Sequence, residues 1–191
     1  METYFGHKEF RSHRPVVTLG IFDGVHRGHR SLLAAVIEKA KESGTDSVVV
    51  TLDPHPRIVL SGGTCSIRYL SSLDEKIQLM SEAGVDKLVV LPFTTELSRM
   101  ETCDFIKNYM VDIIGVRHLV VGYDHHFGRN REGSFEHLKE FGPIYGFEVE
   151  EISAQDIDDV KVSSTKIRLA LETGDIETAN SYLGNPFPLS G

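Results

Sequence analysis

The chain has no tryptophan and only two cysteines, Cys65 and Cys103, among its 191 residues. The cysteines lie far apart and form no CxxC pair, so we expect neither a disulfide framework nor a structural zinc site. No apolar run approaches the length of a membrane span. The N-terminal stretch METYFGHKEFRSHRP has no apolar region of the kind found in signal peptides. We therefore expect a cytoplasmic protein with no membrane partner.

Positive charge is also scarce. Lysine and arginine total 20 against 28 aspartates and glutamates, which gives a net charge of −8 at pH 7. This balance argues against a broad nucleic-acid surface, although it leaves room for a local basic pocket. A hydrophobic content of 40% and a charged content of 25% are ordinary for one globular domain with a substantial core.

Short apolar segments alternate with segments of helical periodicity along the chain. Segments rich in β-branched residues are predicted as strands at 15–22, 46–56, 85–93, 116–124 and 147–153. Helices are predicted at 30–44, 72–84, 101–115, 134–146, 163–174 and 175–184. Apolar strands separated by helices predict an α/β fold, a doubly wound parallel sheet with C-terminal helices. Ligands bind such sheets beyond the carboxyl ends of the strands, where the strand order reverses.

The stretch GIFDGVHRGH, residues 20–29, joins a predicted strand to a predicted helix. Its glycines, Gly20, Gly24 and Gly28, let the backbone approach a ligand closely. The helix begins near His29, so its free N–H groups and positive dipole end point toward this turn. His26 and His29 add directional donors that can carry charge near neutral pH. A phosphate is the simplest ligand, although the stretch is neither a GxxxxGK[ST] loop nor a GxGxxG fingerprint.

The stretch SSTKIR, residues 163–168, has similar properties at another helix start. Ser163 or Ser164 is predicted to cap the helix, and Thr165 falls in its first turn. Arg168 lies one turn further, on the same face as Ser164 and Thr165. Hydroxyls, helix-start N–H groups and a guanidinium fork suit phosphate oxygens. Two anion sites of this kind indicate a polyphosphate that spans them.

Each motif also has an ordinary structural interpretation. HxGH occurs by chance, SST before a helix is commonly only an N-cap, and DPHP at 53–56 is commonly a stiff turn. The adjacent pair His125 and His126 could hold a metal, but neighbours in extended backbone point to opposite faces. Arg129 and Arg131 could be solvated loop charges.

Four motifs in order carry a family resemblance: GIFDGVHRGHRSLL, VVTLDPHP, VVGYDHHFGRNREG and SSTKIR. Together they resemble the FMN adenylyltransferase module of prokaryotic bifunctional FAD synthetases, the riboflavin kinase/FMN adenylyltransferases of the HxGH nucleotidyltransferase superfamily. The resemblance runs from about Val16 to the C-terminus. It implies a Rossmann-like nucleotidyltransferase fold, and an enzyme that transfers AMP from Mg-ATP to FMN, giving FAD and pyrophosphate.

The resemblance also implies roles for individual residues. His26 and His29 would contact the ATP phosphates, and Ser164, Thr165 and Arg168 would hold phosphate from the other side, which makes these five the candidate catalytic residues. The candidate binding residues for ATP and FMN are Gly20, Phe22, Asp23, Gly24, Gly28, Asp53, Pro54, His55, Pro56, Asp124, Phe127, Gly128 and Arg129. Mg²⁺ is expected to arrive with ATP, and its ligands in the protein are not predicted.

The chain departs from the family pattern at a few positions. Leu52 stands where phenylalanine is common, which removes an aromatic contact, while Val162 and Lys166 are milder changes. We expect residues 1–183 to form the adenylyltransferase domain and residues 184–191 to begin a linker to a riboflavin kinase domain that this chain lacks. That domain would be either covalently continuous or a separate protein, and riboflavin kinase activity is expected to be absent.

Three other functions remain open from the sequence. Another small-molecule adenylyl- or cytidylyltransferase of the superfamily would keep HxGH and SSTxxR without needing DPHP or GYDHHFG. A flavin or nucleotide sensor would bind the same ligands without turnover. A structural dimerisation domain would need none of the motifs.

Overall fold

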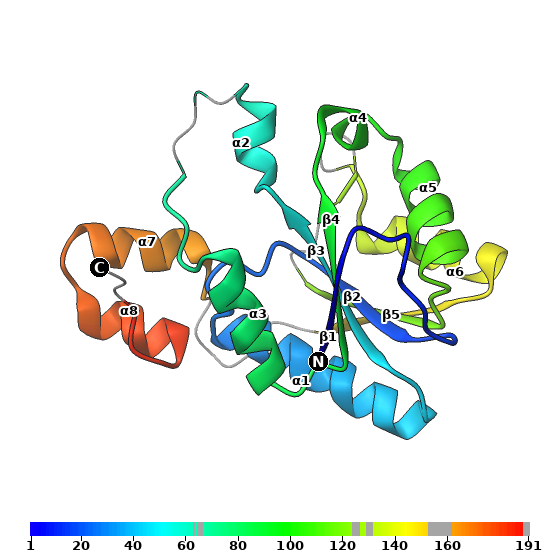
Figure 1. Cartoon of the computed structure of the whole chain (residues 1–191), viewed down its shortest axis with the longest axis horizontal. Helices are drawn as coiled ribbons and strands as arrows, with labels where there is room; N and C mark the ends of the chain where they lie inside the picture. The colour runs from blue at the N-terminus through cyan, green and yellow to red at the C-terminus, as the bar shows by residue number, and fades with distance from the viewer. Residues whose placement is uncertain (63, 65–66, 124–126, 129–131, 153–161, 189–191) are drawn as a thin grey trace.

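The strands of the chain form one parallel sheet in the computed structural model, which describes residues 1–62, 64, 67–123, 127–128, 132–152 and 162–188. They are β1 (Glu2–Phe5), β2 (Val16–Leu19), β3 (Ser47–Asp53), β4 (Lys87–Pro92), β5 (His118–Gly122) and β6 (Glu148–Ile152). The 6-stranded sheet has the order β1-β4-β3-β2-β5-β6, and every neighbouring pair is parallel (Figure 1). The predicted doubly wound α/β fold is confirmed.

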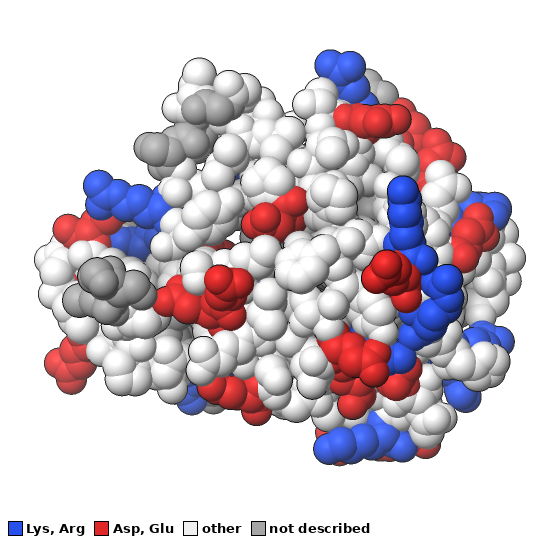
Figure 2. All heavy atoms as spheres, in the orientation of Figure 1, with Lys and Arg blue, Asp and Glu red and all other residues white. Residues whose placement is uncertain are grey.

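Helices connect the strands and extend beyond the sheet. They are α1 (Arg27–Ser43), α2 (Pro56–Leu60), α3 (Leu73–Glu82), α4 (Thr95–Ser98), α5 (Thr102–Phe105), the π-helix η1 (Ile106–Ile113), α6 (Phe135–Tyr145), α7 (Ser164–Glu172) and α8 (Ile176–Leu183). None of the helices in the described part of the chain is long and apolar enough to cross a membrane. Acidic and basic side chains are interspersed over the face shown in Figure 2.

Both faces of the sheet are covered, because successive strand residues point to opposite sides. Val17 and Leu19 of β2 face a core made with α5, η1 and α6. Val16 faces a second core made with α1 and α3. This two-sided burial explains why the central strands are continuously apolar in sequence.

Several short elements were not predicted. β1 is only partly buried at the sheet edge, where Glu2 to Phe5 pair with β4, and its polar sequence carries no apolar run. α2 and α4 are too short to show helical periodicity. The helix predicted at 101–115 is present as α5 followed by η1.

The strand order reverses between β2 and β5. From β2 the chain proceeds to β3 and β4 on one side, whereas β5 and β6 lie on the other side. The loop at residues 20–26 follows β2 directly and therefore lies at this switch point, where open α/β sheets bind ligands. α7 and α8 lie together beside α3 and α1 (Figure 1), and their buried side chains pack with Leu70, which precedes α3.

Candidate functional site

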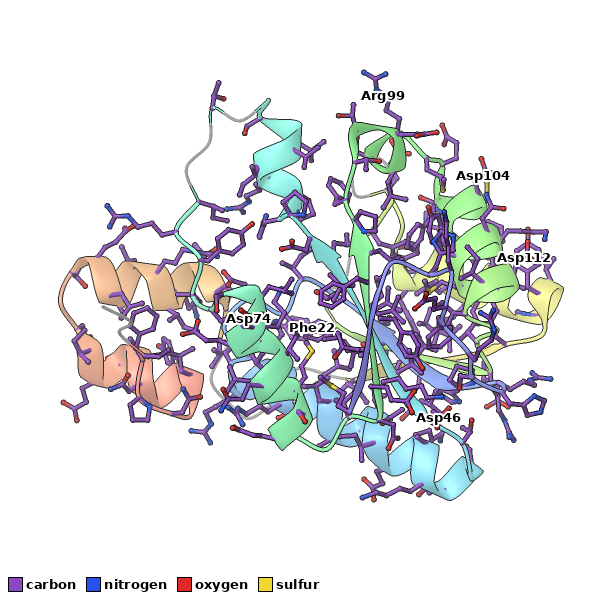
Figure 3. All side chains as sticks on the ribbon, viewed as in Figure 1. Phe22, Asp46, Asp74, Arg99, Asp104 and Asp112 are labelled. Atoms are coloured by element: carbon purple, nitrogen blue, oxygen red, sulfur yellow. The ribbon has the colours of Figure 1, made fainter. Side chains whose placement is uncertain are left out.

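The loop after β2 is a buried, tightly wound turn. Phe22 and Val25 have positive φ values of 52° and 39°, a region that bulky and β-branched residues rarely adopt. Burial compensates for this conformation: Phe22 is 2% exposed and belongs to the core made with α1 and α3, and Figure 3 labels it beside α3. Gly24 also has a positive φ, of 79°, and a Cβ atom there would approach Leu70 Cβ to 2.9 Å. The surrounding core therefore holds the path of this loop.

His26 and His29 form a stacked pair at the start of α1. Their ring centroids are 3.6 Å apart and their planes differ by 15°. His26 is the N-cap of α1, because its Nδ1 accepts the backbone N–H of His29 at 3.3 Å. The ring of His29 also packs edge-on against Phe22, with centroids 5.1 Å apart. Since Nδ1 of His26 is an acceptor, its proton resides on Nε2, which is then the donor available to a ligand.

Both imidazoles are uncharged at neutral pH. Burial lowers the pKa of His26 to about 4. Burial also lowers the pKa of His29 well below its usual value, and the nearby charges of His26 and Lys76 act in the same direction. Within the described part of the chain, Nδ1 of His29 is buried and has no hydrogen-bond partner. The pair therefore offers N–H dipoles to a phosphate rather than positive charge.

Asp23 connects this loop to the SSTKIR helix. Its carboxylate is 2% exposed and is ion-paired with the Arg168 guanidinium. Arg168 also donates from Nε to the carbonyl of Arg68 at 2.7 Å. The hydroxyl of Ser164 donates to the backbone carbonyl of Asp23 at 3.1 Å. The two predicted phosphate motifs, far apart in sequence, are thus in direct contact.

Asp23 also holds the segment that leads into α3. Its carboxylate accepts the backbone N–H groups of Leu70 at 3.0 Å and Ser71 at 3.3 Å. The Ser71 hydroxyl in turn accepts the backbone N–H of Gly24 at 3.0 Å. The family resemblance implies that Asp23 binds ligand, and in the structure its carboxylate is bonded within the protein.

The start of α7 is a capped helix N-terminus. Ser163 is the N-cap, and its hydroxyl accepts the backbone N–H of Lys166 at 3.3 Å. Thr165 is exposed in the first turn, while Ile167 is fully buried and anchors the helix. Thr165 is therefore the hydroxyl of this motif that is most accessible to solvent.

The DPHP motif ends β3 and begins α2. Asp53 and Pro54 lie at this junction, and Pro56 is the first residue of α2. His55 is the N-cap, with its Nδ1 accepting the backbone N–H of Arg57 at 3.1 Å. Burial lowers the pKa of His55, the charge of Asp23 opposes this shift, and the charge of Arg168 adds to it.

The remaining predicted residues lie elsewhere. Phe127 is 8% exposed and packs against Phe105 on the other face of the sheet, so its ring belongs to the core. Gly128 lies against Thr102, where a Cβ atom would approach the Thr102 hydroxyl to 2.5 Å. Gly20 lies against the ring of Phe22, and Gly28 is buried in α1. Leu52 packs beside the core that contains Phe127.

Some predicted residues are not described. Asp124, His125, His126, Arg129 and Arg131 lie outside the residues that the structure describes. Among the residues that it does describe, no group of three or more histidine, cysteine, aspartate or glutamate side chains is placed to hold a metal ion.

Lys76 is a buried lysine near these residues that the sequence motifs did not include. It is 3% exposed, on α3 directly after the segment bound by Asp23. Burial lowers its pKa, while the carboxylates of Asp23 and Asp53 oppose that shift. The available signal was a lysine at a position of α3 where the helical pattern of Leu73, Ile77 and Met80 calls for an apolar residue.

Comparison with known proteins extends these observations. The family model described as FAD synthetase matches residues 8–166. The bifunctional riboflavin kinase/FMN adenylyltransferase of Pseudomonas fluorescens is 39% identical over 176 residues, which cover 92% of this chain and 56% of that protein. Proteins with the same description are 38% identical in Listeria monocytogenes, with 92% and 55% covered, and 35% identical in Escherichia coli K12, with 92% and 56% covered.

A solved structure is similar in fold over nearly the whole chain. It is a crystal structure described as a macrolide-efflux protein from Streptococcus pneumoniae, with a TM-score of 0.84 and 26% identity, and the match covers 98% of this chain and 63% of that one. The chain thus spans a little over half the length of the curated relatives that it matches.

Proposed function

Because the chain belongs to the FAD synthetase family, as the match to residues 8–166 shows, we propose that it transfers the adenylyl group of ATP to FMN, giving FAD and pyrophosphate. The observation that carries this proposal is the junction at Asp23. There the HxGH loop and the SSTKIR helix meet at the switch point of the sheet. Two helix starts that converge on one space suit a ligand with several phosphates.

The reaction requires no protein nucleophile. An oxygen of the FMN phosphate, already ionised at pH 7, attacks the α-phosphorus of ATP and forms the new P–O bond. The bond between the α-phosphorus and the oxygen that bridges to the β-phosphorus breaks, and pyrophosphate leaves with that electron pair. The contribution of the protein is then positioning and electrostatic stabilisation of the transition state.

His26 and His29 serve this purpose as neutral donors. The cap on α1 orients His26, and stacking fixes the two rings against each other. Donors held in place before the substrate arrives need no reorganisation when charge develops on the phosphates. Gly20 and Gly24 let the loop pack closely against Phe22 and Leu70, and contact of Gly20, Gly24 and Gly28 with the phosphates is proposed on the family resemblance.

Ser164, Thr165 and Arg168 act from the opposite side of the ligand. Ser164 and Arg168 are held to Asp23, so α7 is positioned relative to the histidines before ATP binds. The exposed hydroxyl of Thr165 and the N–H groups of Ser164 and Thr165 at the start of α7 face the incoming phosphates in this proposal. Asp23 and Phe22 shape the site from beneath it rather than by contact with the nucleotide.

The flavin would bind next to this phosphate site. We assign Asp53, Pro54, His55 and Pro56 to the wall between ATP and FMN, because this motif follows the carboxyl end of β3, the strand next to β2. Asp124, Phe127, Gly128 and Arg129 remain proposed flavin-side residues on the family resemblance. For Phe127 that role is one of support, since its ring is buried.

Magnesium is proposed as a companion of ATP. The described residues contain no prebuilt cluster of metal ligands. Mg²⁺ generally keeps several waters and binds substrate phosphates with few protein ligands, so it would come to the site with the nucleotide. When bound, it would offset phosphate charge.

We also propose a domain boundary within this chain and a cellular location for the protein. We assign residues 1–183 to the adenylyltransferase domain and 184–191 to the start of a connection to a riboflavin kinase domain, with a cytoplasmic location. Immediately after α8, Asn185 accepts from the Arg30 side chain at 3.0 Å, and the Phe187 N–H donates to Asn180 at 2.7 Å. Asn185 and Phe187, in the first part of this connection, are therefore hydrogen-bonded to α1 and α8.

The test is to incubate the chain with ATP, Mg²⁺ and FMN and to separate the products by chromatography. FAD and pyrophosphate should appear in equal amounts, and riboflavin in place of FMN should yield no FMN. Turnover of another phosphorylated acceptor, such as phosphopantetheine or nicotinate mononucleotide, without FAD would reassign the chain within the superfamily. Binding of ATP and FMN without any turnover would favour a sensor.

A further inference from the structure

Lys76 occupies a position where the fold otherwise places apolar side chains. It lies on α3 three residues after Leu73 and four before Met80, so the three share one face of the helix. Leu73 and Met80 both pack in the core beneath that face. Lys76 itself is only 3% exposed. Lysine is almost never buried to this degree unless it is paired.

The ammonium of Lys76 has no close partner in the described part of the chain, where it takes part in no hydrogen bond and no ion pair. Two carboxylates, Asp23 and Asp53, act on it from a greater distance. The carboxylate of Asp23 is already bound to Arg168 and to the N–H groups before α3. A buried charge without its own counter-ion is costly, and such groups are concentrated at functional sites.

The first turn of α3 is attached to the loop after β2. Lys76 N–H donates to the carbonyl of Ser72, the N-cap, at 3.0 Å. The preceding residue, Ser71, is bonded to both Asp23 and Gly24. The positive charge of Lys76 also acts on His29 and His55. The ammonium is therefore within electrostatic reach of residues from both the HxGH and DPHP motifs.

The histidines themselves cannot supply positive charge to this space at neutral pH, since burial keeps them uncharged. Arg168 is a cation, but its charge is balanced by Asp23. Among the described lysines and arginines, Lys76 is the one classed as buried, while Arg30, next to His29 on α1, is half-buried and donates to Asn185. In surroundings of low polarity, a charge acts over a longer range and more strongly than it would in water.

We propose that Lys76 is the fixed positive charge of the phosphate site, which attracts a nucleotide polyphosphate to the loop between β2 and α1 from beneath that loop. The inference rests on the proposed function, because it takes ATP as the ligand. A lysine suits this role, since its ammonium is a compact point charge on a stem that packs among apolar residues.

The experiment compares Lys76→Met with Lys76→Arg, using Lys41→Met as a matched control on the exposed last turn of α1. The affinities of AMP and ATP, both without metal, are measured by calorimetry. Lys76→Met should lower the affinity for ATP about 10- to 100-fold, as expected for the loss of a charge-assisted interaction. The affinity for AMP, which carries less charge, should fall by a smaller factor. Lys76→Arg should retain ATP affinity within several-fold, and Lys41→Met should match the unsubstituted chain.

If Lys76 had only a structural role, Lys76→Met would lower the affinities for AMP and for ATP by the same factor. That result overturns the proposal, and so does an unchanged affinity for ATP. If Lys76→Met does not fold, the unsubstituted chain is studied by NMR instead. The side-chain resonances of Lys76 should shift when ATP is added, and resonances that do not shift overturn the proposal. Formation of FAD tests the proposed function separately from the role of Lys76. A chain that binds ATP in this Lys76-dependent way but makes no FAD refutes the transfer reaction alone, whereas a chain that binds no ATP refutes both.

Discussion

The Arg168 guanidinium is ion-paired with the Asp23 carboxylate across a separation of 145 positions in the sequence. Asp23 is almost fully buried, and the Arg168 side chain is 15% exposed. The pair links the loop after β2 to α7, and the same carboxylate accepts two backbone N–H groups before α3. One side chain therefore determines how three segments of the site meet.

Asp23→Asn should destabilise the protein strongly. The substitution leaves the Arg168 guanidinium without its anion in a largely buried position. Breaking a buried pair on one side typically costs 3–5 kcal/mol, so the free energy of unfolding should fall by about 3 kcal/mol. Urea denaturation followed by circular dichroism measures this change. FAD formation should fall as well, because α7 is no longer held to the loop.

The matched control for Asp23→Asn is an exposed pair. Lys107 and Asp112 are 2.7 Å apart with side chains about half exposed. Exposed pairs contribute little to stability, so Asp112→Asn should leave the denaturation midpoint nearly unchanged. Equal effects of the two substitutions would show that the link between Asp23 and Arg168 does not organise the site.

His29→Ala should lower turnover far more than it lowers stability or FMN binding. The imidazole is held against His26 and Phe22, and in the proposed mechanism it would donate where charge develops in the transition state. Loss of one such preorganised donor lowers kcat on the order of 100- to 1,000-fold. Steady-state kinetics of FAD formation provide the measurement, with His13→Ala, at an exposed position, as control. A folded His29→Ala variant with full turnover would remove this residue from the mechanism.

His26 should make stability depend on pH in the acid range. Its pKa is about 4 in the folded protein against 6.5 for an unperturbed histidine. Between these values the unfolded chain binds more protons, so the free energy of unfolding falls as the pH falls from about 6.5 to 4. The full difference corresponds to roughly 3 kcal/mol, and this group adds no further change below pH 4 or above 6.5.

His26→Asn tests that assignment. Asparagine is a good N-cap and does not titrate in this range, so it keeps the cap and removes the proton uptake. Urea denaturation at pH 7, 6 and 5 should show a smaller loss of stability in the variant than in the unsubstituted chain. His13→Asn, an exposed control, should behave as the unsubstituted chain does. Identical slopes for all three proteins would contradict the neutral, buried state of His26.

Gly24→Ala should be more damaging than Gly44→Ala. Both glycines have positive φ values, 79° and 62°, so alanine is strained at either position by about 1–2 kcal/mol. A Cβ atom at Gly44 meets nothing within 4 Å, whereas one at Gly24 meets Leu70 Cβ at 2.9 Å. The clash adds about 1–3 kcal/mol and displaces the loop. Denaturation should show the larger loss for Gly24→Ala, and kinetics should show a fall in turnover for that variant alone. Equal losses of unfolding free energy for the two variants would mean that the loop accommodates a Cβ atom at position 24 without a clash.

Local patterns were sufficient for much of the fold. The buried strands β2 to β5 could be predicted because a strand that is covered on both faces must be apolar throughout. The start of α3 could be predicted as well, because Ser72 and Glu75 satisfy each other's backbone N–H groups in a capping box. Such signals depend only on neighbours along the chain. The HxGH and SSTKIR motifs were visible for the same reason, since each is a short helix start.

Only the tertiary structure decided how these pieces act together. The sequence indicated that His26 and His29 can carry charge, but burial keeps them neutral, and burial depends on which distant residues pack over a group. Asp23 was assigned to the ligand, yet its partners are Arg168 and the segment before α3, which no local pattern connects to it. Lys76 interrupts an apolar helical pattern in the sequence, but only the fold shows that this face of α3 packs onto the core and buries the lysine. Charge balance in a buried site is a property of the whole fold, because it is set by groups that meet only when the chain is folded.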